Sequence, residues 1–436
     1  MISRINKYFS KANILSKSPA VGDTAVLYIS TLISSGVGFV SSVIVARQLG
    51  PTEFAVVAGY NAIVLTLAGF TDFGLGTGLI KFTSPFLKNK KINSSAPYFR
   101  FVFILELVIG ALLLSLGLLF AGFIPKLLGQ NMSVETVRIA VVAASITSVA
   151  AYVGAAMAAH KKFKLNAIIS IMLSVIKFVI IFLLWKTGNI SVANIILAYV
   201  LMSVISAAVG FAVAPKDYLY KTDRQRVWSA GRKVIRFSGW LTLSFFITSI
   251  MGKLDFFYLY KLKGPGDAGV YAAAQQLSMV YSIFVGAIGT VLTPYISEKV
   301  SHNEKINFLK KTLPLAFLGA ALFIVTIPIT PYIVNLVFGQ KYVNAINPLI
   351  VLILSLAVNI VLIPITLMFI PLGKVKFGTY VALIQLGLSF LLYPTMIARF
   401  GAVGAAATIL IAALFALAVY PIILSSLLRK EKYASK

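Results

Sequence analysis

Long apolar stretches alternate with short polar ones along the whole chain. Windows of about 20 apolar residues, the length of an α-helix that crosses a bilayer, predict six helices in the first half, near residues 25–46, 54–73, 101–123, 136–158, 166–185 and 191–213. The same windows predict six more near residues 237–260, 268–293, 313–337, 344–371, 377–397 and 401–428. The pattern predicts an all-α polytopic membrane protein with about twelve transmembrane helices.

Composition agrees with this pattern, because 59% of the 436 residues are hydrophobic, against about 45 to 50% in an ordinary soluble domain. The chain has no cysteine, so thiolate metal sites and disulfides are excluded, and we expect no metal and no cofactor. Residues 1–24 are basic but lack the apolar core of a signal peptide. An interfacial amphipathic helix and a basic tail both fit this segment.

The basic residues lie mostly on one side of the predicted helices. Of the 39 Lys and Arg residues, 29 fall on the side of the N-terminus, seven on the other side and three within helices. By the positive-inside rule both termini are cytoplasmic. The formal charge of +27 is then a topology signal and not a sign of nucleic-acid binding. The basic linker 214–236 is expected to lie along the anionic inner leaflet or to dock a partner, and residues 429–436 form a basic cytoplasmic tail.

The two halves of the chain share an internal repeat. The stretches QLGPTEFAV (48–56) and LKGPGDAGV (262–270) match 214 residues apart, and KTGNISVAN (186–194) matches RFGAVGAAA (399–407) at an offset of 213. Six helices per repeat is an even number, so the two halves share one orientation in the membrane. The repeat predicts two six-helix bundles, at 25–213 and 237–428, with a substrate cleft between them at the midplane.

Several of these segments resemble a known family of exporters. The stretch FVSSVIVARQLGPTEFAVVAGYNAIVLTLAGFTDFGLGTGLIKF (39–82) resembles the opening of Wzx-type polysaccharide flippases of the MOP (multidrug/oligosaccharidyl-lipid/polysaccharide) exporter superfamily. The second half continues the likeness with FSGWLTLSFFITSIMGKLDFFYLYKLKGPGDAGVYAAAQQL (237–277), LTPYISE (292–298), VFGQKY (337–342) and RFGAVGAA (399–406). Ala55 departs from the pattern, since many relatives have glycine there.

The resemblance implies both a fold and a function. The fold is two six-helix bundles around a V-shaped central cavity, as in MATE and other MOP transporters. The function is movement of an undecaprenyl-diphosphate-linked oligosaccharide from the cytoplasmic to the outer leaflet of the inner membrane, by alternating access, for O-antigen, capsule or exopolysaccharide synthesis. The implied partners are the lipid-linked oligosaccharide, membrane lipids, and polymerase or chain-length proteins of the same pathway.

Charged residues within the apolar windows are the first candidates for substrate contact, because a charge in hydrocarbon is costly and usually faces protein or water. Lys177 lies about 17 Å along its helix from the cytoplasmic end and suits a diphosphate or an acidic sugar. Pairing with an acid and snorkelling are the alternatives. Lys253, nearer the outer end of its helix, suits a release-side contact or snorkelling.

Asp255 lies two residues from Lys253, so the two side chains leave the helix about 200° apart and cannot neutralise each other on one face. Three roles fit Asp255: pairing with a cation of the other half, carrying a coupling proton or sodium ion, and capping a hydrogen-bond network. Arg47 and Lys261 are equivalent in the repeat. They suit either a gate at the outer mouth and substrate contact, or interface anchoring.

Polar residues elsewhere complete the set of candidates. Asp72 and Glu106 suit an inner gate or ion coupling, with Lys81 or Arg100 as partners, or a plain surface salt bridge. Five amides suit hydrogen bonds to sugars or simple joining of helices, and they are Gln275, Gln276, Asn61, Asn359 and Gln385.

Two other function classes compete with the flippase. An ion-coupled MATE-like exporter of drugs or cations would share the fold, but it favours an acidic cavity, whereas the embedded charges here are mostly basic. A membrane glycosyltransferase, polymerase or ligase needs room for a catalytic loop, and every predicted outer connection is about a dozen residues or fewer. No Walker A pattern is present, so the sequence predicts a transporter and not an enzyme or an ATPase.

Overall fold

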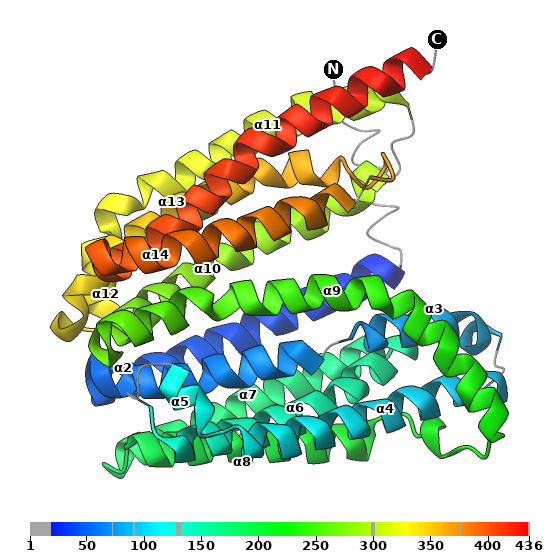
Figure 1. Ribbon diagram of the computed structural model, residues 1–436, viewed down its shortest axis with the longest axis horizontal. Coiled ribbons are helices and arrows are strands. Elements are labelled where there is room, and N and C mark those ends of the chain that lie inside the picture. Colours follow the sequence, from blue (N-terminus) through cyan, green and yellow to red (C-terminus); the bar gives the residue numbers. More distant parts are fainter. Residues whose placement is uncertain are drawn as a thin grey trace. The chain divides into compact units, whose positions relative to one another are not determined.

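The protein is a multi-pass membrane protein built from helices. The computed structural model describes residues 19–71, 73–89, 92–127, 132–297, 301–374 and 376–434. Within these ranges every regular element is a helix (Figure 1). Nine helical stretches there are long and apolar enough to cross a membrane.

The helices of the first half begin with the 53-residue α2 (Pro19–Thr71), which holds two predicted segments. The elements that follow are α3 (Leu75–Lys88), α4 (Ile92–Leu119), α5 (Phe123–Leu127), α6 (Val134–Ala159), α7 (Phe163–Lys186), α8 (Val192–Val213) and the short 3-10 helix η1 (Asp217–Leu219).

The second half begins with α9 (Arg224–Lys263). The following elements are α10 (Pro265–Ser297), α11 (His302–Val325), η2 (Ile327–Ile329), α12 (Thr330–Val337), η3 (Gln340–Ala345), α13 (Ile346–Leu367) and α14 (Lys376–Ala434). Each of the twelve predicted segments falls mainly within these helices, although α2 and α14 each join two of them. Twelve separate spans therefore stay a prediction.

Glycines of the internal repeat mark the breaks between helices. Gly50 (φ 75°) kinks α2 before Pro51, and its repeat partner Gly264 (φ 84°) separates α9 from α10 before Pro265. A left-handed backbone favours glycine, and proline lacks the N–H that would continue a helix, so the Gly-Pro pair breaks both helices in the same way. The second pair of repeat glycines, at 188 and 401, also has positive φ, of 71° and 55°.

Two helices start earlier than the apolar windows predict. The α9 helix begins at Arg224, well before 237, and α11 begins at His302, well before 313. In α11, Ser301 and Glu304 form a capping box that fixes the polar start of the helix. Hydropathy windows miss such helix starts because charged residues in the first turns lower the mean hydropathy of the window.

The chain divides into two compact units. The first holds the described residues of Met1–Ile44, Leu67–Leu119 and Ile139–Phe245, and the second holds those of Val45–Thr66, Phe120–Arg138 and Phe246–Lys436. The boundaries pass through α2, α6 and α9, so the second unit includes the part of α2 around the Gly50 kink. The predicted division into bundles at 25–213 and 237–428 stays a prediction.

In the first unit, the core joins α3, α4 and α6 to the start of α9. Phe99 and Val102 of α4 pack with Ala230 and Val234 of α9. A Cβ on Gly231 would lie only 2.2 Å from the ring of Phe101, so glycine is required where α9 crosses α4. The polar start of α9 is thus held by packing that the apolar windows do not reveal.

In the second unit, α13 lies at the centre and contacts α10, α11 and α14 (Figure 1). One core cluster combines Ile296 of α10, Phe308 of α11, Ile365 of α13 and Leu424 of α14. In water, burial of each large apolar side chain at such a junction would stabilise the fold by about 1.5 to 3 kcal/mol. In lipid the helices are held together instead by close packing and interhelical hydrogen bonds.

Candidate functional site

Lys177 of α7 faces the interior of the first unit. Six of the seven exposed large hydrophobic side chains of α7 form one stripe, and only Trp185, near the end of the helix, lies outside it; the six are Ile168, Met172, Val175, Val179, Phe182 and Leu183. At about 100° per residue, Lys177 lies about 180° from the middle of this stripe. The lysine is half-buried, and its side chain therefore points away from the face that suits lipid.

The Lys177 ammonium contacts the aromatic ring of Tyr199. Its Nζ lies 3.8 Å from the ring centroid of Tyr199 on α8, a cation–π distance. Within the described part of the chain, no carboxylate lies within 4 Å of Lys177. The ring cannot engage all three N–H donors of the ammonium, so donors remain that can bind an anionic ligand.

Asp255 of α9 occupies a different setting, in the second unit. It is 2% exposed. Its Oδ2 accepts hydrogen bonds from the Tyr271 hydroxyl (2.6 Å) and the Gln275 side-chain amide (2.5 Å), and its Oδ1 accepts one from the Phe256 backbone N–H (2.7 Å). Among the described residues, the three groups that donate hydrogen bonds to Asp255 are neutral, so they hold the carboxylate without a salt bridge.

Two further side chains interact with Asp255 through space. Lys253 and Tyr393 lie close enough for an electrostatic effect on the carboxylate. Tyr393 of α14 is 3% exposed and stacks on Tyr258 of α9, with 5.9 Å between the ring centroids. The structure thus places Asp255 in a buried polar cluster shared by α9, α10 and α14.

Arg47, which the repeat pairs with Lys261, binds main-chain oxygens at the end of α12. Its Nε donates to the Val337 carbonyl at 2.6 Å, and its Nη2 donates to the Leu336 carbonyl. A cation at a helix C-terminus interacts favourably with the helix dipole. Arg47 and Lys261 are both exposed, so exposure does not separate the two repeat positions, and the bonds to α12 are what distinguish Arg47.

Contacts around Arg47 fasten the kinked part of α2 to the rest of the second unit. Tyr342 donates a hydrogen bond to the Ala46 carbonyl at 2.8 Å. A Cβ on Gly269 would lie 1.8 Å from the Pro51 carbonyl oxygen, so the two Gly-Pro stretches of the repeat touch. This cluster lies on the side that the basic residues predict to be the outer one.

Two of the five predicted amides hydrogen-bond to another helical segment, and two bond within their own helix. Gln275 binds Asp255, and Gln385 donates to the Ala412 carbonyl at 2.8 Å across the two arms of α14. Asn61 and Asn359 each donate to a carbonyl one turn earlier in their own helices. Gln276 is half-buried.

The predicted inner gate is described only in part. Asp72 lies outside the described residues, and Glu106 of α4 is 4% exposed. Lys81 places its Nζ 3.7 Å from the ring centroid of Phe237. Whether Asp72 and Glu106 form a gate therefore stays a prediction.

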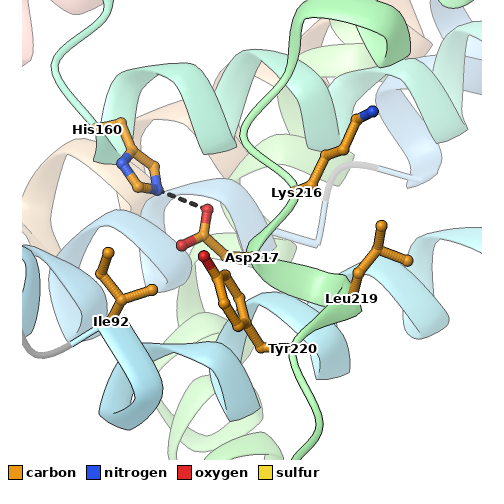
Figure 2. Close-up of a pocket in the computed structure, with 6 residues that line it drawn as sticks. All are labelled: Ile92, His160, Lys216, Asp217, Leu219 and Tyr220. Carbon is orange, nitrogen blue, oxygen red and sulfur yellow. Dashed lines mark hydrogen bonds and ion pairs between the residues drawn. The ribbon is translucent and has the colours of Figure 1, made fainter.

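A pocket of about 450 Å³ lies beside η1 in the first unit. Figure 2 shows His160 turned toward Asp217, with their side chains 2.8 Å apart, while the Lys216 side chain extends away from the pair. Asp217 is 4% exposed. The pair ties the end of α6 to the segment after α8, on the side predicted to be cytoplasmic.

A second pair of the same kind, which sequence reasoning missed, occurs in the second unit. Glu431 near the end of α14 binds Lys305 and His302 of α11, the latter at 3.4 Å. Asp217 and Glu431 are 214 residues apart, which is the offset of the repeat, and each follows the last predicted helix of its half. That spacing, together with the presence of only two histidines in the chain, was the signal that could have found both pairs.

Comparisons with known proteins agree with this architecture. A family model described as "Polysaccharide biosynthesis protein" matches residues 20–300. The chain is 26% identical over 226 residues to a Shigella flexneri protein whose name describes an O-antigen transporter, and the match covers 50% of this chain and 52% of that protein. The chain thus spans about half the length of this relative.

Solved structures show the fold. The inward-facing form of a multidrug resistance MATE family transporter of the MOP superfamily has a TM-score of 0.73 at 15% identity, over 90% of this chain and 95% of that one. The lipid II flippase MurJ, in an inward closed conformation, has a TM-score of 0.68 at 16% identity, over 93% of this chain and 90% of that one. The protein therefore has the MATE and MOP fold predicted from its sequence.

Proposed function

The chain belongs to the polysaccharide biosynthesis protein family, and from this premise we propose that it is a flippase for a lipid-linked oligosaccharide. The substrate is a polyprenyl-diphosphate-linked glycan, which moves from the cytoplasmic to the outer leaflet of the plasma membrane by alternating access. Both termini are cytoplasmic in this proposal, as the distribution of basic residues predicts. The product serves synthesis of a surface polysaccharide, together with polymerase or chain-length proteins of the same pathway.

Lys177 is the observation that carries the proposal. A glycan and a diphosphate keep their hydration only along a polar path, because their transfer into hydrocarbon is prohibitively costly. An ammonium at membrane depth is itself costly unless it faces protein, water or a ligand. The placement of Lys177 opposite the exposed stripe of α7, over the ring of Tyr199, supports a role in receiving the diphosphate.

Asp255 and Arg47 receive supporting roles. Asp255, held by neutral donors, is proposed to bind the coupling proton or sodium ion. Arg47 is proposed to close the outer side by its bonds to the end of α12, and these bonds break when the site opens outward. Lys253 and Lys261 are proposed as weaker contacts along the exit path.

A MATE-like antiporter of drugs or cations is the alternative, and the fold alone supports it. Such an exporter needs an acid that its cationic substrate can reach. Asp255 is buried and already accepts three hydrogen bonds, which suits a proton or a small ion better than a drug-sized cation, whereas the Lys177 ammonium over the Tyr199 ring keeps donors for a ligand. This charge favours an anionic substrate.

Reconstitution into liposomes tests the substrate class. The purified protein is expected to accelerate transbilayer movement of a fluorescent polyprenyl-diphosphate oligosaccharide, measured by quenching with an impermeant reductant. Liposomes with the Lys177→Ala variant at equal protein content serve as the matched control and should stay near the rate of empty liposomes. Export of ethidium by the native protein, without movement of the oligosaccharide lipid, would assign it to the drug exporters instead.

A further inference from the structure

A groove of about 710 Å³ runs between α4 and the first turns of α9, within the first unit. Its walls are almost wholly apolar. The α4 side consists of Phe101, Ile104, Leu105 and Val108, and the α9 side includes Trp228. None of these residues has a place in the flippase mechanism proposed above, so the groove needs an occupant of its own.

The α4 wall of the groove has the shape of an acyl-chain track. Its residues are spaced i, i+3, i+4 and i+7, which places them on one helix face over about 10 Å. Ile104 is 46% and Val108 is 47% exposed. Two helical turns of open apolar surface, beside an indole 59% exposed, fit a hydrocarbon chain lying parallel to α4.

The end of the groove at α9 is cationic. Arg224 and Gln225 line it there. Asp223 is the neighbouring acid, and its carboxylate accepts a hydrogen bond from the Gln225 backbone N–H at 3.4 Å as the start of α9 forms. Arg224 is exposed, and no acid lies within 4 Å of it in the described ranges. Its guanidinium is therefore available to bind a phosphate oxygen in a bidentate way.

The surroundings select the charge of the occupant. The α9 helix carries four more exposed cations, Arg226, Arg232, Lys233 and Arg236, and the Arg232 guanidinium lies 6.0 Å from the ring centroid of Trp228. Basic residues near a membrane surface attract anionic lipids. A ligand with a negative headgroup and a hydrocarbon chain can bind the cationic end of the groove with its headgroup and the apolar α4 wall with its chain.

We propose that this groove is a binding site for one anionic phospholipid of the cytoplasmic leaflet. The acyl chain lies against Ile104 and Val108, and the phosphate binds Arg224. The assignment of the leaflet rests on the proposed orientation, whereas the site itself does not depend on the transported substrate. Because the groove lies between α4 and the start of α9, the bound lipid helps to hold the start of this helix against α4.

Lipid retention tests the site directly. The purified full-length protein in detergent is exposed to equal amounts of a phosphatidylglycerol and a phosphatidylcholine with the same chains, and bound lipid is counted by native mass spectrometry. The native protein should retain one phosphatidylglycerol at least about tenfold more than phosphatidylcholine, because the choline cation of phosphatidylcholine offsets the charge of the phosphate that Arg224 binds. Arg224→Gln should bring the ratio close to one.

Matched variants separate this site from a diffuse charge effect. Arg236→Gln removes one cation from the same helix but does not touch the groove, and it should keep the native ratio. Val108→Trp, which fills the groove, should lower retention of both lipids while the protein still elutes as a single species. Equal losses in Arg224→Gln and Arg236→Gln, or a native ratio in Arg224→Gln, would overturn the proposal.

The transported lipid is the competing occupant. Added polyprenyl diphosphate should leave the bound phosphatidylglycerol in place. Displacement at equimolar amounts would assign the groove to the substrate tail and reject the phospholipid. Because the readout is bound mass and not transport, a failure here leaves the proposed flippase activity untouched, and a failed flipping assay leaves this site untouched.

Discussion

Lys177 and Asp255 are both charged residues in membrane-length helices, but their surroundings are opposite. Asp255 accepts three hydrogen bonds and is 2% exposed. Lys177 is half-buried on the interior face of α7 and has an aromatic ring as its recorded contact. A buried acid with all these donors is held in one place, whereas an ammonium over a ring keeps donors for a ligand. The difference teaches that depth in the membrane alone does not define a substrate site.

Replacement of Lys177 is the strongest way to break this comparison. Lys177→Ala should lower transport of the oligosaccharide lipid by more than about tenfold, equivalent to about 1.4 kcal/mol, because the diphosphate loses its cation. Melting of the detergent-solubilised protein should change little, since no hydrogen-bonded partner is left behind. Lys177→Arg should keep a substantial part of the rate. An unfolded Lys177→Ala protein would show that the lysine is structural instead.

Replacement of Asp255 should show the reverse balance. Asp255→Ala leaves the Tyr271 hydroxyl and the Gln275 amide without their acceptor, so the protein should be destabilised by about 1 to 3 kcal/mol, seen as a lower melting temperature. Asp255→Asn offers one oxygen to both donors, which bind the same Oδ2, and should lose less stability.

The same pair of variants sharpens the proposed coupling role. Asn cannot carry a proton, so Asp255→Asn should transport without a response to an imposed ion gradient while remaining folded. A gradient response equal to that of the native protein would remove Asp255 from coupling and leave it a structural acid.

Lys253 should have the smallest effect. It is half-buried and affects Asp255 only through space. Lys253→Ala should therefore lower transport by roughly two- to fivefold, equivalent to about 0.5 to 1 kcal/mol, with melting close to the native value. A loss as large as that of Lys177→Ala would place the two lysines on one path.

The sequence predicted the helices of this protein better than their partners. The apolar windows located the long helices because hydrophobic length is a local property, although nine helical stretches of the described residues qualify as membrane spans and α9 is not among them. The Gly-Pro repeat located the breaks, since glycine and proline impose their backbone geometry on the spot. The polar starts of α9 and α11 were missed, because packing of Ala230 and Val234, and the capping box at Ser301, override low hydropathy.

The candidate site divides in the same way. Lys177 and Asp255 stand out in the sequence as charges within apolar runs. Their contacts do not, because Tyr199 and Tyr271 are ordinary aromatic residues of the next helix. Arg47 binds main-chain carbonyls 289 and 290 residues away, and a carbonyl has no signature in a sequence. The groove of α4 and α9 depends on Gly231, whose need is visible only beside the Phe101 ring.

The sequence by itself determined that this chain is a helical membrane protein with a duplicated half, that it carries a few charges at membrane depth, and where its helices break. Only the tertiary structure decided that hydrogen bonds hold Asp255, that Lys177 lies over an aromatic ring, and where Arg47 docks. The physical reason is range: hydrophobic length and backbone preference act between neighbours in sequence, whereas hydrogen bonds and close packing join residues that only folding brings together.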